Sequence, residues 1–307
     1  MDAQLAGFLL AKIEFDKPAL SVPDHIGLLK TRGMTISDID RAAHYLRFIG
    51  YYRLSGYWFP FQYRDQTAKH DHFREGTDFE SVLDRYIFDR QLRLLAMDAL
   101  ERIEIAARAA MSDVMSERHG AHWYRKSRLF KHGMHASFLE TVRRDSGIEP
   151  YNTKRQTDFI RHYVQTYNRP IEPPSWMVFE ILSFGSVSWC FKSLVNTEKA
   201  AIASQFGFHR TRIESWLHSA SHLRNLCAHH SRVWNRTFGV FPVKGDHIVP
   251  NPKRFYNHAS MIQAMLTRIS ADTRWAERLR ELIASHPNID PAEMGFPTQW
   301  PDRSPWR

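Results

Sequence analysis

The sequence predicts an all-α protein, on three observations. The chain has 307 residues, of which 43% are hydrophobic and 13% aromatic, enough for a large core. Residues 78–118 contain neither proline nor glycine, and their apolar residues recur at helical spacing. Further segments of helical periodicity follow, almost to the end of the chain. Alternation typical of strands occurs only around residues 239–252, where the pattern is compatible with a small hairpin turning at Gly245 and Asp246.

The N-terminal part is expected to add helices before the long one. Residues 31–35 indicate a turn, and residues 37–40 supply N-cap side chains for a helix that runs to Ile49 and ends at Gly50. The next segment, residues 51–61, carries six aromatic residues with arginines close by. We favour an aromatic cluster that builds the core. The alternative is a platform on which unpaired bases stack.

The long segment 78–118 predicts one helix, or two with a kink, with a charged face formed by Asp89, Arg90, Arg93, Glu101, Arg102, Glu104 and Arg108. A basic region with short helices is expected to follow from residue 121 to 170. Ser175 could cap a helix over 176–194, and later helices are predicted over 198–205, 212–229, 259–270 and 273–285. The last 21 residues hold five prolines. We therefore expect a single domain over residues 1–286 and an extended tail over 287–307.

The net charge and the cysteine content indicate the kind of partner and the cellular compartment to expect. With 42 Lys and Arg against 33 Asp and Glu, the net charge of +9 favours a polyanionic partner such as nucleic acid. The two cysteines, Cys190 and Cys227, exclude a disulfide framework and suit a reducing compartment. The N-terminus lacks the pattern of a signal peptide, and the most apolar stretch, 176–195, is interrupted by Glu180 and Lys192. We expect a cytoplasmic protein that makes no use of a membrane.

The segment most informative about chemistry lies within residues 212–236. On a helix its apolar residues form one stripe (Ile213, Trp216, Ala220, Leu223 and Cys227), and a polar stripe lies roughly opposite (His218, His222, Asn225 and His229). Arg224 lies beside the polar stripe and needs a carboxylate, a phosphate or water as its partner. A permanent cation can hold a phosphate, and an imidazole can transfer a proton near neutral pH. The alternative is a structural charge cluster at a helix end.

Four blocks of the sequence, residues 45–62, 76–109, 173–189 and 224–236, together resemble the Abi-like family of bacterial abortive-infection proteins of the D and F types. The resemblance extends from about Leu28 to the MGFPTQW segment near the C-terminus. This family looks like part of the HEPN superfamily, whose ribonucleases carry an R-x4-H motif with a polar residue after the arginine. Arg224, Asn225 and His229 match that motif.

The resemblance implies a HEPN-like helical bundle with its core at about residues 78–236. It also implies a homodimer in which two motifs meet to cut RNA without a metal, as a toxin of antiviral defence. Arg224 would bind and polarise the scissile phosphate, and His229 would act as general acid or base. Asn225 would orient the imidazole or a phosphate oxygen.

Neighbouring residues are expected to support this set. Glu104, or Glu101, is a candidate partner for Arg224, and His230 is expected beside the site as a supporting residue. Arg232, Trp234 and Arg236 follow the motif and could track an RNA backbone, with one ring available for stacking. The equally favoured alternative is a solvated loop in which Trp234 packs inward.

Other functions remain to be compared with RNA cleavage. His218 and His222 have a spacing that suits zinc, with His229 as a third ligand, but no Asp or Glu lies between residues 215 and 245 and no H-E-x-x-H motif is present. We therefore expect neither a metal nor another cofactor. A Ser-His-Asp hydrolase is disfavoured because no G-x-S-x-G sequence occurs. The main alternatives are a non-catalytic protein of a defence or toxin–antitoxin system that binds RNA, including a regulatory RNA, and a structural protein whose Arg224 anchors a dimer interface.

Overall fold

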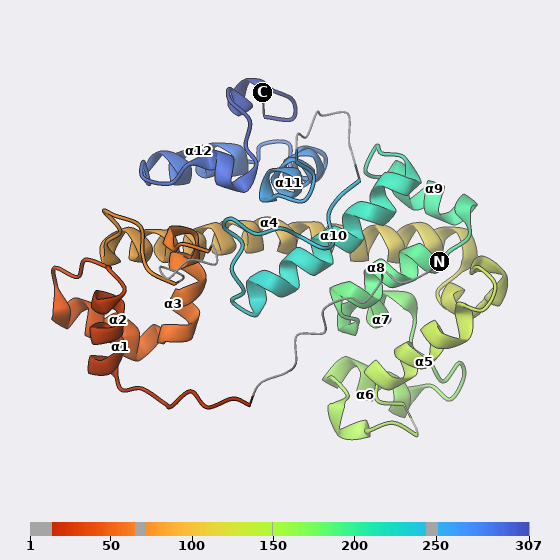
Figure 1. Ribbon diagram of the computed structural model, residues 1–307. Coiled ribbons are helices and arrows are strands. Elements are labelled where there is room, and N and C mark those ends of the chain that lie inside the picture. The colour runs from red at the N-terminus through yellow and green to blue at the C-terminus, as the bar shows by residue number, and fades with distance from the viewer. Residues whose placement is uncertain (1–13, 65–70, 149, 244–250, 307) are drawn as a thin grey trace, which may run out of the picture. The chain divides into compact units, whose positions relative to one another are not determined.

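The computed structural model describes residues 14–64, 71–148, 150–243 and 251–306 (Figure 1). Within these ranges it contains twelve α-helices and six short 3-10 helices, and β-pairing is limited to isolated bridges. The prediction of an all-α protein is confirmed. The expected hairpin turn at Gly245 and Asp246 lies outside the described residues.

The chain divides into two compact units, Met1–Leu83 and Asp84–Arg307. The boundary falls inside the long helix α4 (Phe79–His119), where the sequence carries no signal for a domain border. The single domain expected over residues 1–286 stays a prediction, and each unit is described here by itself.

The first unit contains α1 (Val22–Thr31), α2 (Ile39–Ile49) and α3 (Tyr51–Trp58). Helix α2 has the predicted ends. The Asp38 carboxylate accepts a hydrogen bond from the Arg41 backbone N–H at 2.8 Å, and the helix ends at Gly50, whose φ of 92° suits glycine. Helix α1 was not expected from the sequence, although Ser21 and Asp24 form a capping box at its start.

The aromatic segment of the first unit, residues 51–61, has some rings in the core and others exposed to solvent. Tyr57 and Trp58 are buried, and the Trp58 ring lies 6.3 Å from the ring of Phe73. Tyr52 on the opposite side of α3 is 92% exposed, and Phe59 in the following 3-10 helix (Phe59–Phe61) is also exposed. The core-building interpretation is therefore correct for Tyr57 and Trp58, the two buried residues of the six.

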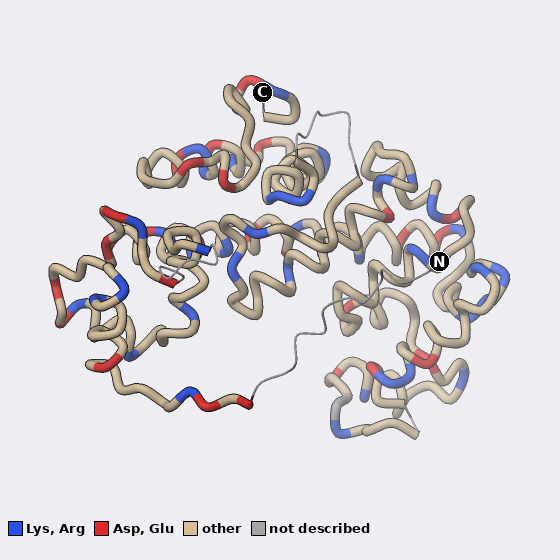
Figure 2. The backbone as a smooth tube through the Cα atoms, in the orientation of Figure 1, with Lys and Arg blue, Asp and Glu red and all other residues tan. Residues whose placement is uncertain are grey.

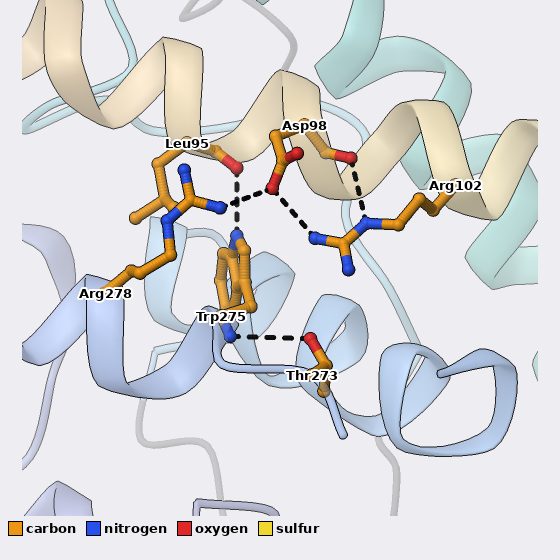
Figure 3. A network of polar contacts seen from close by, with 6 residues as sticks. All are labelled: Leu95, Asp98, Arg102, Thr273, Trp275 and Arg278. Atoms are coloured by element: carbon orange, nitrogen blue, oxygen red, sulfur yellow. Dashed lines mark hydrogen bonds and ion pairs between the residues drawn. The ribbon is translucent and has the colours of Figure 1, made fainter. Parts of the chain in front are cut away.

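Helix α4 runs without a break for 41 residues, roughly 60 Å. Its expected charged face is not uniformly solvated, because Asp89, Arg93 and Glu104 are buried. The reason is that elements of the second unit contact α4 on several sides. Figure 3 shows one such contact, in which Trp275 donates its indole N–H to the carbonyl of Leu95 at 2.9 Å. Polar residues in such an enclosed helix must pair with one another or with backbone groups.

The second unit continues with α5 (His135–Asp145) and α6 (Asp158–Thr166), joined by 3-10 turns at Trp123–Arg125, Ser127–Leu129 and Thr153–Arg155. A buried carboxylate fixes the chain after α6. Glu172 receives Arg125 at 3.0 Å and Arg143 at 2.6 Å, which satisfies both of its oxygens. The Tyr124 hydroxyl donates to the carbonyl of Pro173, the residue that follows Glu172 in the chain.

The single helix expected over 176–194 is wrong, because the structure has two, α7 (Ser175–Ile181) and α8 (Phe184–Ser193). The Ser183 hydroxyl accepts from the Ser186 N–H at 3.1 Å and so begins a new helix after Leu182. Ser175 is not the cap of α7. It is the first residue of that helix, and its hydroxyl lies 2.7 Å from the Ser116 hydroxyl of α4.

The remaining predicted helices are confirmed as α9 (Asn196–Ser204), α10 (Arg210–Ala228), α11 (Phe255–Ile269) and α12 (Trp275–Ala284). In the described part of the chain, no helix has the length and apolar character that crossing a membrane requires.

The tail after α12 contains only 3-10 turns (Pro291–Met294 and Trp300–Asp302), but it does not extend away from the second unit. Trp300 and Trp306 are buried. The Trp306 ring stacks on Tyr256 of α11 at 6.1 Å and on Trp275 of α12 at 6.0 Å. The prolines prevent regular helix, while the aromatic rings supply apolar area that is stable only when buried.

A buried histidine on α11 makes the stability of the protein depend on pH. The Nε2 atom of His258 lies 3.2 Å from the carbonyl of Val240, so a neutral imidazole donates there. Desolvation lowers the pKa of His258 from 6.5 to about 4. As the pH falls between these values, the unfolded chain takes up a proton that the folded chain does not, so the free energy of unfolding decreases.

We expect His258 to cost the wild type about 2 kcal/mol of stability between pH 7 and pH 5. Urea unfolding at both pH values would measure this loss in the wild type and in His258→Gln, which cannot titrate. The exposed His162→Gln on α6 is the matched control and should keep the wild-type loss. An equal pH dependence in His258→Gln and wild type would contradict the prediction.

Candidate functional site

Helix α10 presents the two faces that its sequence predicts. Its apolar stripe is buried throughout, at Ile213, Trp216, Ala220, Leu223 and Cys227. On the other side, His218, Asn225 and His229 are exposed and His222 is half-buried. The spacing of 3.6 residues per turn places Asn225 and His229 one turn apart on this accessible face.

Arg224 is held at the margin of this face by an acidic residue of α4. Its Nε lies 3.5 Å from the Oε2 atom of Glu104, whose side chain is only 11% exposed, while Arg224 itself is 35% exposed. Arg224 also donates to the Asn225 side-chain carbonyl at 3.2 Å. A guanidinium has five N–H donors, more than these two contacts use, so Arg224 can still bind an anion from solvent.

Glu104 has a second partner that connects three helices. Arg108, one turn further along α4, pairs with the Glu104 carboxylate and donates to the backbone carbonyl of Phe179 in α7. The Glu104 carboxylate therefore lies between two guanidinium groups. This arrangement fixes Arg224 relative to α4 and α7 while part of its side chain stays accessible.

Helix α10 ends directly at the motif. His229 is the C-cap residue, and its N–H donates to the Asn225 carbonyl at 2.9 Å. His230 has a φ of 57°, in the left-handed region, and its N–H donates to the Cys227 carbonyl at 3.0 Å. His230 thus contributes its backbone to the end of the helix, and the exposed His229 side chain stands at the last turn.

The loop after the motif is anchored by Asp89, which the sequence placed on a charged helix face without indicating this role. The buried Asp89 carboxylate of α4 accepts the backbone N–H groups of Val233 and Trp234 at 2.9 and 2.7 Å. Arg93, one turn later on α4, pairs with the same carboxylate. No local pattern marks Asp89 for this task, because its backbone partners lie 144 and 145 positions away.

Trp234 is not available as a stacking ring for RNA. It is fully buried, and its indole N–H donates to the Glu293 carboxylate at 3.0 Å. The alternative, an inward Trp234, is therefore what the structure shows. Arg232 and Arg236 remain half-exposed, and Arg236 donates to the Arg232 carbonyl at 3.3 Å. Both arginines stay candidates for contact with a nucleic-acid backbone.

The segment of the chain that carries the motif is positively charged, although Glu104 of α4 pairs with Arg224. Residues 215–243 contain three arginines and no acidic residue, in contrast to the mixed charges along most of the chain (Figure 2). Burial lowers the pKa of the His222 imidazole, and the nearby Arg236 and His218 lower it further. A region of this kind attracts phosphate groups.

The described residues contain no group of three or more His, Cys, Asp and Glu side chains that could hold a metal ion. Both cysteines are buried and unpaired with each other. Burial raises the pKa of Cys227 to about 12, so its thiol does not ionise near neutral pH.

Fold and site together define an all-α protein that presents an arginine, an amide and an imidazole at the end of one helix. The sequence model of the Abi-like protein family matches residues 44–235, which include this motif. The chain belongs to that family, as the sequence blocks predicted, and membership suggests a role in abortive-infection defence. No curated protein and no solved structure matches the chain.

Proposed function

We propose that this protein is a metal-independent endoribonuclease of the HEPN type that acts in abortive-infection defence. The observation that carries the proposal is the joint placement of Arg224 and His229. The guanidinium is fixed by Glu104 and remains partly accessible, and the imidazole is exposed one turn beyond Asn225 on the same helix. Family membership supports the biological role.

The chemistry requires only these groups and RNA. The 2′-oxygen of a ribose attacks the adjacent phosphorus and forms a 2′,3′-cyclic phosphate, while the bond from phosphorus to the 5′-oxygen breaks. A base accepts the proton of the 2′-hydroxyl and an acid gives a proton to the 5′-oxygen, a role that suits an imidazole. Arg224 stabilises the negative charge that develops on the phosphate oxygens.

A homodimer would supply both proton-transfer groups at once. One His229 could act as the base and the His229 of a second copy as the acid, if the two motifs face each other. This part of the proposal predicts a mass near twice 36.1 kDa in light scattering. A monomer at assay concentrations would remove the second imidazole from the scheme.

The decisive experiment is incubation of purified wild-type protein with total bacterial RNA in the presence of EDTA. We expect new RNA fragments that end in 2′,3′-cyclic phosphate and begin with 5′-hydroxyl groups. RNA binding that weakens with salt, without any new ends, would instead identify a non-catalytic RNA-binding protein, for which Arg232 and Arg236 are suitable contacts.

A further inference from the structure

A second positively charged site lies at the other end of α10. A pocket of about 260 Å³ opens between the start of α10, the end of α11 and the C-terminal segment. Its walls include two arginines, two aromatic rings and two hydroxyl groups, from Arg212, Arg268, Phe208, Trp216, Thr267 and Ser304. None of these residues belongs to the motif at the end of α10.

The two arginines are held by aromatic rings. The Arg212 guanidinium carbon lies 5.6 Å from the ring centres of both Phe208 and Trp216. The Arg268 guanidinium carbon lies 5.7 Å from the same Phe208 ring. The attraction between a guanidinium group and the face of an aromatic ring is electrostatic. These contacts place both guanidinium groups beside the Phe208 ring at the wall of the pocket.

Backbone geometry contributes to the approach of Arg268. Gly207 has a φ of 68°, and a Cβ atom at this position would lie 3.4 Å from the guanidinium carbon of Arg268. The absence of a side chain lets the guanidinium lie close to the backbone. Among the described residues no carboxylate forms an ion pair with Arg268.

The chemistry of the pocket matches a phosphate group attached to a sugar. Two guanidinium groups on the wall of one pocket can both donate hydrogen bonds to a phosphate. The Thr267 hydroxyl donates to the Ala264 carbonyl at 2.9 Å, so its oxygen is an acceptor for a hydroxyl of a ligand. The volume lies below the roughly 300 Å³ at which drug-sized sites begin, which suits a single nucleotide unit.

We propose that this pocket binds one phosphate group of an RNA strand and acts as an anchor away from the motif. Arg212 and Arg224 are twelve residues apart on α10, roughly 18 Å along its axis, so one strand can span both positions. Phosphate binding itself stands on the pocket alone, and the assignment of the phosphate to RNA rests on the proposed function.

Fluorescence anisotropy with a labelled single-stranded RNA tests the anchor, in a His229→Ala background so that any cleavage does not change the ligand. Arg212→Gln and Arg268→Gln should each weaken binding roughly 3- to 10-fold and reduce the salt dependence of log K by about one. Arg274→Gln, which removes an exposed arginine outside the pocket, is the matched control and should leave both quantities unchanged.

A second variant and a second ligand keep the outcomes distinct. Arg268→Lys retains the charge but not the planar guanidinium group, so it should bind RNA with an affinity between wild type and Arg268→Gln. If AMP or inorganic phosphate binds at the pocket and RNA affinity is the same in Arg268→Gln as in the control, the RNA assignment is overturned. If the wild type cuts no RNA but the pocket variants still weaken RNA binding, the proposed nuclease fails and the anchor stands.

Discussion

Replacing His229 with alanine is expected to lower the rate of RNA cleavage about 100- to 10,000-fold, the contribution typical of a positioned acid or base. The side chain is exposed at the last turn of α10, so its removal leaves the core unchanged. We therefore expect the free energy of unfolding to stay within about 0.5 kcal/mol of wild type. Loss of rate without loss of stability would identify a chemical role.

The assay is the appearance of cyclic-phosphate ends with time, measured in EDTA for wild type, His229→Ala and a control. His218→Ala is suitable as the control because His218 is also exposed on α10 but lies outside the motif. It should cleave within about 3-fold of wild type, as expected of a surface substitution. Cleavage by His229→Ala at the wild-type rate would falsify the assignment of His229, whatever the behaviour of Arg224.

Replacing Asp89 with alanine is expected to lower the free energy of unfolding by about 3–5 kcal/mol, the cost of leaving one member of a buried ion pair alone. The substitution leaves the buried Arg93 guanidinium without this carboxylate and removes the acceptor for two backbone N–H groups, of Val233 and Trp234. Asp89→Asn keeps one carbonyl acceptor and should lose less.

Asp98 offers a matched control on the same helix. Its carboxylate receives Arg102 at 2.8 Å and Arg278 at 2.7 Å, but its side chain is 43% exposed (Figure 3). Ion pairs of this kind contribute about 0–1 kcal/mol each, so Asp98→Ala should cost far less than Asp89→Ala. Urea unfolding of wild type, Asp89→Ala and Asp98→Ala measures the difference in the free energy of unfolding. Equal losses of stability in the two variants would contradict the importance of burial.

Local sequence signals predicted the elements that depend on local interactions. Helix α2 has its expected ends because Asp38 and Gly50 act within one turn of the helix they bound. The two faces of α10 follow from the spacing of its own residues. The break between α7 and α8 was missed because an apolar run concealed the capping role of Ser183.

Features that depend on distant contacts could not be predicted in the same way. The sequence places Asp89 on a charged helix face, and only the folded chain brings it to the backbone of Val233. Likewise, nothing near Trp306 indicates that its ring will meet Trp275 on α12. For the candidate site, the motif itself was visible in the sequence, while the inward position of Trp234 required the structure.

The contact between Asp89 and the loop after the motif also has a consequence for synthesis of the protein. Helix α4 leaves the ribosome long before Val233 and Trp234 do. The hydrogen bond from the Trp234 indole to Glu293 requires a residue that is made 59 positions later still. Contacts this far apart in the chain form late, because the intervening chain must first be ordered. The loop that follows His229 can thus complete these contacts only after Glu293 has been synthesised.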